Sequence, residues 1–244
     1  MALINYRGVF PVLNNSTRIT IVFPDINPEE GEKWPVLWLL GEEGMSSDYY
    51  VRKCDIESLS RKYNVAIVMP EGLHSDYENM LRGLRWYDFV SDALPKFFYD
   101  HFPISDRKED NYVFGFGMGG LGAFRLALRI PELADAFGCC GTDFDVFEND
   151  VFHRAAEFVH KMKTIYGDDY LSDQVLEVSD PYHMVQNAAC IPRLIVYGDD
   201  SATVRVQKML AKQPNGTYLA DAELDLGNYE AVLDSFLTFA INLQ

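Results

Sequence analysis

The chain has 244 residues, of which 48% are hydrophobic and 24% are charged, and its formal net charge is −16 at pH 7. This length and apolar content suffice for one substantial core, so we expect a single domain over residues 1–244. The acidic excess repels nucleic-acid phosphates and anionic lipid, so we expect neither nucleic acid nor a membrane as a partner.

Cellular location and cofactors are constrained by what the chain lacks. No apolar run reaches the roughly 18 residues that span a bilayer, and MALINYRGVF lacks the basic start and cleavage site of a signal peptide. The four cysteines match neither a disulfide framework nor a paired metal-binding spacing; they are Cys54, Cys139, Cys140 and Cys190. We therefore expect a soluble cytoplasmic protein with reduced thiols, no metal and no cofactor.

Short apolar runs alternate with segments of helical period, a pattern typical of an α/β fold with a mostly parallel sheet. The predicted strands are Arg18–Phe23, Pro35–Leu40, Val65–Met69, Tyr112–Phe116, Ala136–Cys140, Arg193–Tyr197 and Thr217–Leu224. The predicted helices are Ser47–Tyr63, Trp86–His101, Gly119–Arg129, Val204–Gln213 and Tyr229–Leu243.

Two segments stand out from this alternation. The first predicted strand, RITIVF, alternates polar and apolar residues, so we expect it to be an antiparallel edge strand, whereas the later strands are nearly continuously apolar. Residues Asp143 to Ala189 are helical in pattern and contain no predicted strand. We interpret them as a helical insertion or lid over the site.

The segment GFGMGG, residues 115–120, ends a strand and opens a helix. A nucleophile elbow has this context and follows the pattern G-x-S-x-G, with small neighbours because the turn is tight. Gly117 occupies the nucleophile position here. The same glycines also fit the dinucleotide-binding pattern G-x-G-x-x-G, but several strands precede this one and the next ends in FGCCG without an acidic residue. We therefore disfavour nucleotide binding.

Similarity to a known family extends well beyond the elbow. The chain resembles the tributyrin-esterase and S-formylglutathione-hydrolase branch of the α/β-hydrolases in WPVLWLLGEEG, YYVRKCDIESLSRKYNVAIVMP, WYDFVSDALPKFFYDHFP and NYVFGFGMGGLGAFRLAL. The resemblance implies an α/β-hydrolase fold, with a mostly parallel twisted sheet flanked by helices. It also implies the ancestral chemistry of a serine carboxylesterase that acts on short acyl esters or thioesters.

The chain departs from that family at the residues that would perform the chemistry. Where the family has His-Gly or Ser-Gly in the loop that shapes the oxyanion hole, this chain reads Gly41-Glu42-Glu43, which places carboxylates where donors are needed. The nucleophile position falls on Gly117, which has no side chain to attack with.

The positions of the acid and of the base are also substituted. By resemblance the acid falls on Ser201, although Asp199 and Asp200 are close enough for a shifted alignment to restore a carboxylate. The histidine position before the last helix falls on Asn228, and no histidine follows His183. By this resemblance the catalytic triad is degenerate at all three positions, Gly117, Ser201 and Asn228. Loss of a triad removes most of the rate of hydrolysis.

A relocated site is the main alternative. Its candidate nucleophiles at the carboxyl ends of strands are Ser46, Ser47, Cys140 and Ser201, and His74 beside Ser75 is the best candidate base. The simpler interpretation is that His74 is a solvated loop residue and that Cys139 and Cys140 are unreactive thiols in the core. The pairs Glu42–Glu43 and Asp199–Asp200 are minor candidates for a divalent-ion site, since no spacing supplies a third ligand.

The sequence thus predicts a catalytically degenerate esterase that binds a small ligand or a protein partner in a residual pocket. We expect that pocket at Gly41, Glu42, His74, Met118 and Asp200, where the Met118 backbone N–H at a helix start could recognise an oxygen. The competing hypotheses are an active ester hydrolase with a relocated nucleophile and a structural subunit that forms homo-oligomers.

Overall fold

The structure is a computed structural model that describes residues 2–25, 28, 31–148, 155–189, 192–212, 217–219, 225 and 227–241. The strands are β1 (Ala2–Phe10), β2 (Asn15–Phe23), β3 (Val36–Leu40), β4 (Ala66–Pro70), β5 (Asn111–Phe116), β6 (Ala136–Cys140), β7 (Arg193–Tyr197) and β8 (Thr217–Leu219). The helices are α1 (Ile56–Tyr63), α2 (Trp86–Asp88), α3 (Leu94–His101), α4 (Met118–Arg129), α5 (Ala156–Tyr166), α6 (Asp173–Ser179), α7 (Pro181–Asn187), α8 (Ser201–Leu210) and α9 (Tyr229–Ile241). Single turns complete the described elements, with 3₁₀ geometry in η1 (Tyr50–Arg52) and η3 (Lys108–Asp110) and π geometry in η2 (Phe89–Ala93).

The strands form one sheet of eight in the order β1-β2-β4-β3-β5-β6-β7-β8. The strands β1 and β2 pair antiparallel, as do β2 and β4, and every later pair is parallel. The chain crosses between parallel neighbours through helices, which cover both faces of the sheet. The predicted mostly parallel sheet flanked by helices is thereby confirmed.

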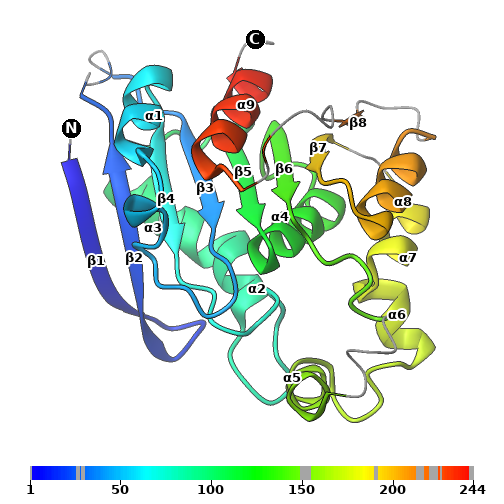
Figure 1. Cartoon of the computed structure of the whole chain (residues 1–244). Coiled ribbons are helices and arrows are strands. Elements are labelled where there is room, and N and C mark those ends of the chain that lie inside the picture. Colours follow the sequence, from blue (N-terminus) through cyan, green and yellow to red (C-terminus); the bar gives the residue numbers. More distant parts are fainter. Residues whose placement is uncertain are drawn as a thin grey trace.

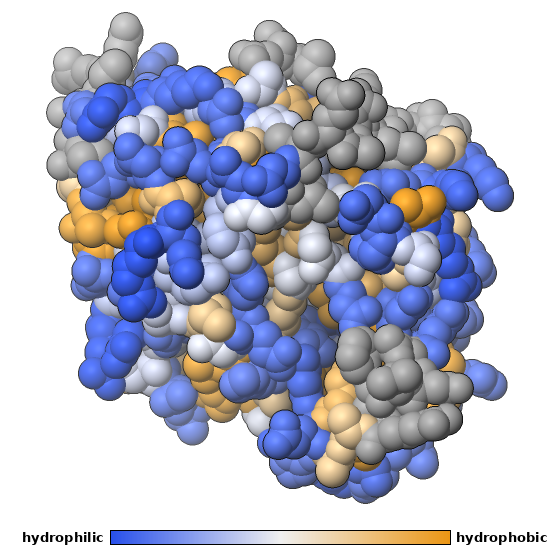
Figure 2. Space-filling view, in the orientation of Figure 1, coloured by the Kyte–Doolittle hydropathy of each residue, from blue (hydrophilic) through white to orange (hydrophobic). Residues whose placement is uncertain are grey.

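Helices lie on both faces of the sheet (Figure 1), and an apolar core under each set holds the layers together. One core joins the sheet to α1 and α9, and the other joins it to α3, α4 and α8. Fully buried aromatic side chains anchor both, including Phe98 and Phe124 in one core and Phe114 and Phe236 in the other. In the orientation of Figure 2, most of the visible surface is hydrophilic, with apolar residues in smaller groups between.

The prediction that Arg18–Phe23 is an edge strand is wrong, because β1 pairs along the whole of β2 and lies outside it. Most side chains of β1 are exposed or half-buried, so the segment carries no apolar run that would predict a strand. The predicted helix Ser47–Tyr63 is likewise interrupted. Asp55 accepts a hydrogen bond from the Ser58 N–H and caps α1, which separates that helix from the turn η1.

Other boundaries differ only at helix and strand ends. Helix α8 begins at Ser201 rather than Val204 because the Asp200 carboxylate accepts from the Thr203 N–H at 2.9 Å and caps the helix. The predicted strand Thr217–Leu224 is present as β8, and its last residues lie outside the described part. The same holds for the ends of the two predicted helices that run to 213 and 243.

Residues 143–189 contain α5, α6 and α7 in the part that the structure describes, which excludes 149–154. Helix α5 lies beyond the carboxyl ends of the central strands, apart from the helices that cover the sheet (Figure 1). Whether the whole chain forms one domain stays a prediction. Within the described ranges, no helix combines the length and apolarity that a bilayer crossing needs.

Candidate functional site

The turn between β5 and α4 has the geometry of a nucleophile elbow. Gly117 adopts φ +52° and ψ −119°, a conformation that side chains rarely tolerate, and its N–H donates to the Cys140 carbonyl at 2.9 Å. A Cβ at Gly115 would lie 2.1 Å from the Gly119 carbonyl, and one at Gly119 would lie 2.2 Å from the Leu40 carbonyl oxygen. The flanking glycines are therefore required by the turn itself.

The space in front of Gly117 is not closed. A Cβ built there would meet only the Glu42 side chain, at 3.5 Å from Cγ and 3.8 Å from Oε2, which is ordinary van der Waals contact. The elbow thus has room for a nucleophilic side chain and presents none. The group that lies beside the vacant position is a carboxylate, which is an acceptor and repels a developing oxyanion.

Glu42 is held in place by tyrosines. The Tyr229 hydroxyl donates to Glu42 Oε1 at 2.7 Å and lies 3.2 Å from the Tyr49 hydroxyl. Burial, followed by Tyr49 and Glu42, raises the pKa of Tyr229 well above its ordinary value, so this phenol stays protonated and donates. Beside Gly117 the structure therefore places a tyrosine–carboxylate pair.

One backbone donor of the loop after β3 is already engaged. The Gly41 N–H donates to the Tyr77 hydroxyl at 2.8 Å, and Tyr77 is 1% exposed. That donor is therefore already satisfied. Met118, the first residue of α4, lines the pocket described below.

The remaining predicted triad positions do not line the pocket that contains Gly117. Asn228 is exposed, accepts from the Ala231 N–H at 3.1 Å and caps α9, and it lines a surface depression whose lining does not include Gly117. The Asp200 carboxylate is engaged in its own helix cap, and Ser201 is exposed beside it. Asp199 is also exposed. The residue that reaches the elbow from α9 is Tyr229, the neighbour of Asn228.

A pocket of about 830 Å³ opens beside the elbow. Its floor includes Gly117, Met118 and Leu121, and its far wall is formed by residues of α5 such as Phe158 and Lys161. Its volume lies within the range of sites that bind small molecules. Of the residues predicted for a ligand pocket, Met118 and His74 line it, whereas Gly41, Glu42 and Asp200 lie outside its lining.

Lys161 crosses the pocket and joins two of its walls. Its ammonium lies 2.8 Å from Glu43 Oε1 and 2.7 Å from Asp76 Oδ1, and 18% of its side chain is exposed. Burial favours the neutral amine, but Asp76 and Glu43 outweigh it and raise the pKa of Lys161. Burial likewise opposes ionisation of Glu43, and contact with Lys161 and then His74 lowers its pKa. Both groups are charged at neutral pH.

The candidate relocated nucleophiles are engaged elsewhere or inert. Ser47 accepts from the Thr20 hydroxyl and Ser75 donates to the Gly72 carbonyl. Burial, and then Glu42, raises the pKa of the Cys140 thiol to about 12, so it is not a thiolate at neutral pH. Throughout the described residues, no serine or threonine hydroxyl is hydrogen-bonded to a histidine ring.

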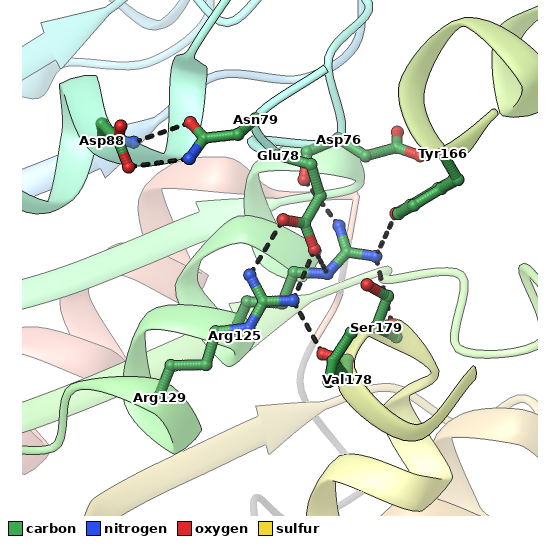
Figure 3. A network of polar contacts seen from close by, with 9 residues as sticks. All are labelled: Asp76, Glu78, Asn79, Asp88, Arg125, Arg129, Tyr166, Val178 and Ser179. Atoms are coloured by element: carbon green, nitrogen blue, oxygen red, sulfur yellow. Dashed lines mark hydrogen bonds and ion pairs between the residues drawn. The ribbon is translucent and has the colours of Figure 1, made fainter. Parts of the chain in front are cut away.

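Helix α5 and the end of α6 are fastened to the core by a buried arginine network (Figure 3). Arg125 of α4 is 0% exposed and donates to the Asp76 carbonyl at 2.6 Å and to the Tyr166 hydroxyl at 2.7 Å. Its Nε lies 3.1 Å from Glu78, which also binds Arg129 through both carboxylate oxygens. This network sets the distance between α5 and the elbow, and hence the shape of the pocket.

Several site residues carry no signal that sequence reasoning could have used. Lys161, Asp76 and Glu43 come from three segments that are distant in sequence, and no spacing or periodicity links them. Tyr229 opens the predicted last helix next to Asn228, but no motif marks it as a site residue. In the described ranges no group of His, Cys, Asp and Glu is arranged to hold a metal ion.

Comparison with known proteins gives one family and one fold. A family model described as "Putative esterase" matches residues 11–141. An acetyl esterase of Caldicellulosiruptor saccharolyticus is 29% identical over 139 residues, which are 53% of this chain and 52% of that protein, so the match spans about half the length of this curated relative.

Solved structures match over nearly the whole chain. FphF of Staphylococcus aureus, a fluorophosphonate-binding serine hydrolase, has a TM-score of 0.81 at 20% identity, with 98% of both chains covered. An S-formylglutathione hydrolase of Agrobacterium tumefaciens has a TM-score of 0.79 at 17% identity, with 97% of this chain and 93% of that chain covered. These likenesses confirm the predicted α/β-hydrolase fold.

Proposed function

The chain belongs to this esterase family, and from that premise we propose that it has lost ester hydrolysis and binds a small ligand in the pocket beside Gly117. The observation that carries the proposal is the conformation of Gly117. The strained turn that exists to display a nucleophile is intact, while the side chain that would attack is absent.

The surroundings of Gly117 support the same proposal. Acyl transfer needs a base to accept the nucleophile's proton and donors to stabilise the oxyanion. Next to Gly117 stands the Glu42 carboxylate, whose Oε1 is already occupied by the Tyr229 hydroxyl. A pocket of about 830 Å³ with apolar and charged walls lies beside Gly117. A pocket of this size can bind a small molecule without a catalytic nucleophile.

The alternative is an ester hydrolase that acts through a relocated group. The observation that favours it is the contact of His74 Nδ1 with Glu43 Oε1 at 3.2 Å on the pocket wall, since a histidine held by a carboxylate can act as a base. The His74 side chain is 70% exposed, and Glu43 is shared with Lys161, which weakens its hold on the ring.

Ester turnover distinguishes the two. We expect the purified protein to hydrolyse p-nitrophenyl acetate and p-nitrophenyl butyrate no faster than a heat-denatured sample of equal concentration. The variants His74→Ala and Glu42→Gln should leave that background unchanged. Turnover well above the denatured sample that disappears in either variant would contradict the proposal and identify the relocated group.

A further inference from the structure

We propose that the ligand of this pocket is an organic cation, an ammonium group carried on an apolar body of small-molecule size. The inference rests on the proposed ligand-binding function and goes further by naming the chemical class. It follows from which charges line the pocket, which of them are already paired, and what the rest of the wall is made of.

Acidic groups outnumber basic ones along the wall. Four lining residues carry carboxylates, namely Glu43, Asp76, Asp143 and Glu157, and Lys161 carries the one lysine or arginine charge among the described lining residues. The whole chain adds a net charge of −16, which draws cations and repels anions before contact. An ester hydrolase that stabilises an oxyanion needs the opposite balance.

A second, independent feature of the wall is a buried carboxylate oxygen without a donor. The Asp76 side chain is 3% exposed; Oδ1 binds Lys161 at 2.7 Å, and Oδ2 has no hydrogen-bond partner among the described residues. Buried polar atoms are nearly always paired, and an unpaired one at a pocket wall calls for a donor from a ligand. A carboxylate accepts best from a charged N–H group.

Asp143 adds to this acceptor character. Asp143 lines the pocket and is exposed, yet the surrounding protein partly desolvates its carboxyl. That burial, followed by the neighbouring Asp145, Asp200 and Asp76, raises its pKa above the ordinary value. The carboxylates around the pocket therefore repel one another, and a positive charge bound between them would relieve that repulsion.

Lys161 does not reverse the balance. Its ammonium is committed to Glu43 and Asp76, and these contacts keep it charged despite burial. It thereby neutralises one of the four carboxylates and leaves an excess of negative charge in a partly closed space. Apolar side chains, Met80, Met118 and Leu121 among them, make up much of the remaining lining, which suits a hydrocarbon body rather than a bare ion.

The test compares three probes of the same size and different charge. Isothermal titration calorimetry should show that phenethylamine binds at least tenfold more tightly than neutral 2-phenylethanol, and that phenylacetate binds more weakly than either. Binding of phenethylamine should fall at least tenfold in Asp76→Asn and several-fold in Asp143→Asn. The matched control Asp100→Asn, which removes one exposed carboxylate on α3 outside the pocket, should leave binding within twofold.

A pocket-filling variant, Thr164→Trp on α5, keeps the test decisive if Asp76→Asn fails to fold, because it should abolish phenethylamine binding without changing charge. Equal or tighter binding of 2-phenylethanol or phenylacetate, still lost in Thr164→Trp, would overturn the cation class and leave the ligand pocket standing. Phenethylamine binding that survives Thr164→Trp would reveal surface ion pairing and overturn the inference. Failure of all three probes to bind would also overturn the inference. The proposed loss of catalysis is tested separately, by ester turnover.

Discussion

Restoring a serine at the elbow tests the local geometry most sharply. In Gly117→Ser the new Cβ meets Glu42 atoms at 3.5 to 4.0 Å, so no steric clash is introduced. The cost comes from φ +52° and ψ −119°, a conformation that costs a side chain about 1–3 kcal/mol. For a chain of this size that corresponds to a melting temperature lowered by roughly 2–12 °C.

The same variant should remain without esterase activity. Its hydroxyl would lie beside a carboxylate that is already bound to Tyr229, and no described histidine contacts that position. Calorimetry gives the melting temperature, and p-nitrophenyl butyrate gives the turnover.

The control Gly115→Ser places a Cβ 2.1 Å from backbone atoms of Gly119, so it should be far more destabilised or fail to fold. Ester turnover by Gly117→Ser, or a melting temperature equal to that of the parent protein, would refute the reasoning.

Three further perturbations test the network, the tyrosine pair and the crowded carboxylates. Arg125→Met should lower the free energy of unfolding by about 3–5 kcal/mol in urea titration, because it leaves a buried carboxylate with one partner fewer, whereas Lys96→Met on the exposed face of α3 should leave the curve unchanged. Tyr229→Phe should cost about 1.5–3 kcal/mol by the same measurement, since the lost hydrogen bond has a charged acceptor; an unaltered curve would show that the contact contributes nothing. Asp143 has a raised folded-state pKa, so the folded state takes up its proton first as pH falls, and its charged form costs stability at neutral pH. Asp143→Asn should therefore raise the melting temperature at pH 7, with a gain that shrinks as pH falls through that raised pKa toward the unfolded value; a gain independent of pH would contradict this.

The sequence predicted the strands and the turn whose formation depends on neighbouring residues in the chain. Strands β6 and β7 match the predicted ranges at both ends because each is a short, largely apolar run, which in β7 follows Arg193. The elbow was found because its glycines are forced by close backbone approach, as the 2.1 Å and 2.2 Å contacts at Gly115 and Gly119 demonstrate.

The features that escaped prediction depend on long-range contacts. Strand β1 forms because β2 offers it a pairing edge, not because its own sequence is strongly apolar. The position of Lys161 between Glu43 and Asp76 depends on how α5 is fastened by Arg125 and Tyr166. No periodicity in the chain contains that information.

Covalent labelling by a fluorophosphonate probe, read by intact mass, tests the central claim most directly, because the probe reacts with activated serines wherever they lie. Run beside a working serine hydrolase as positive control, this protein should show the unmodified mass after prolonged incubation, since Gly117 offers no oxygen at the elbow. An adduct formed in one-to-one proportion with the folded protein, and absent after heat denaturation, would contradict the account.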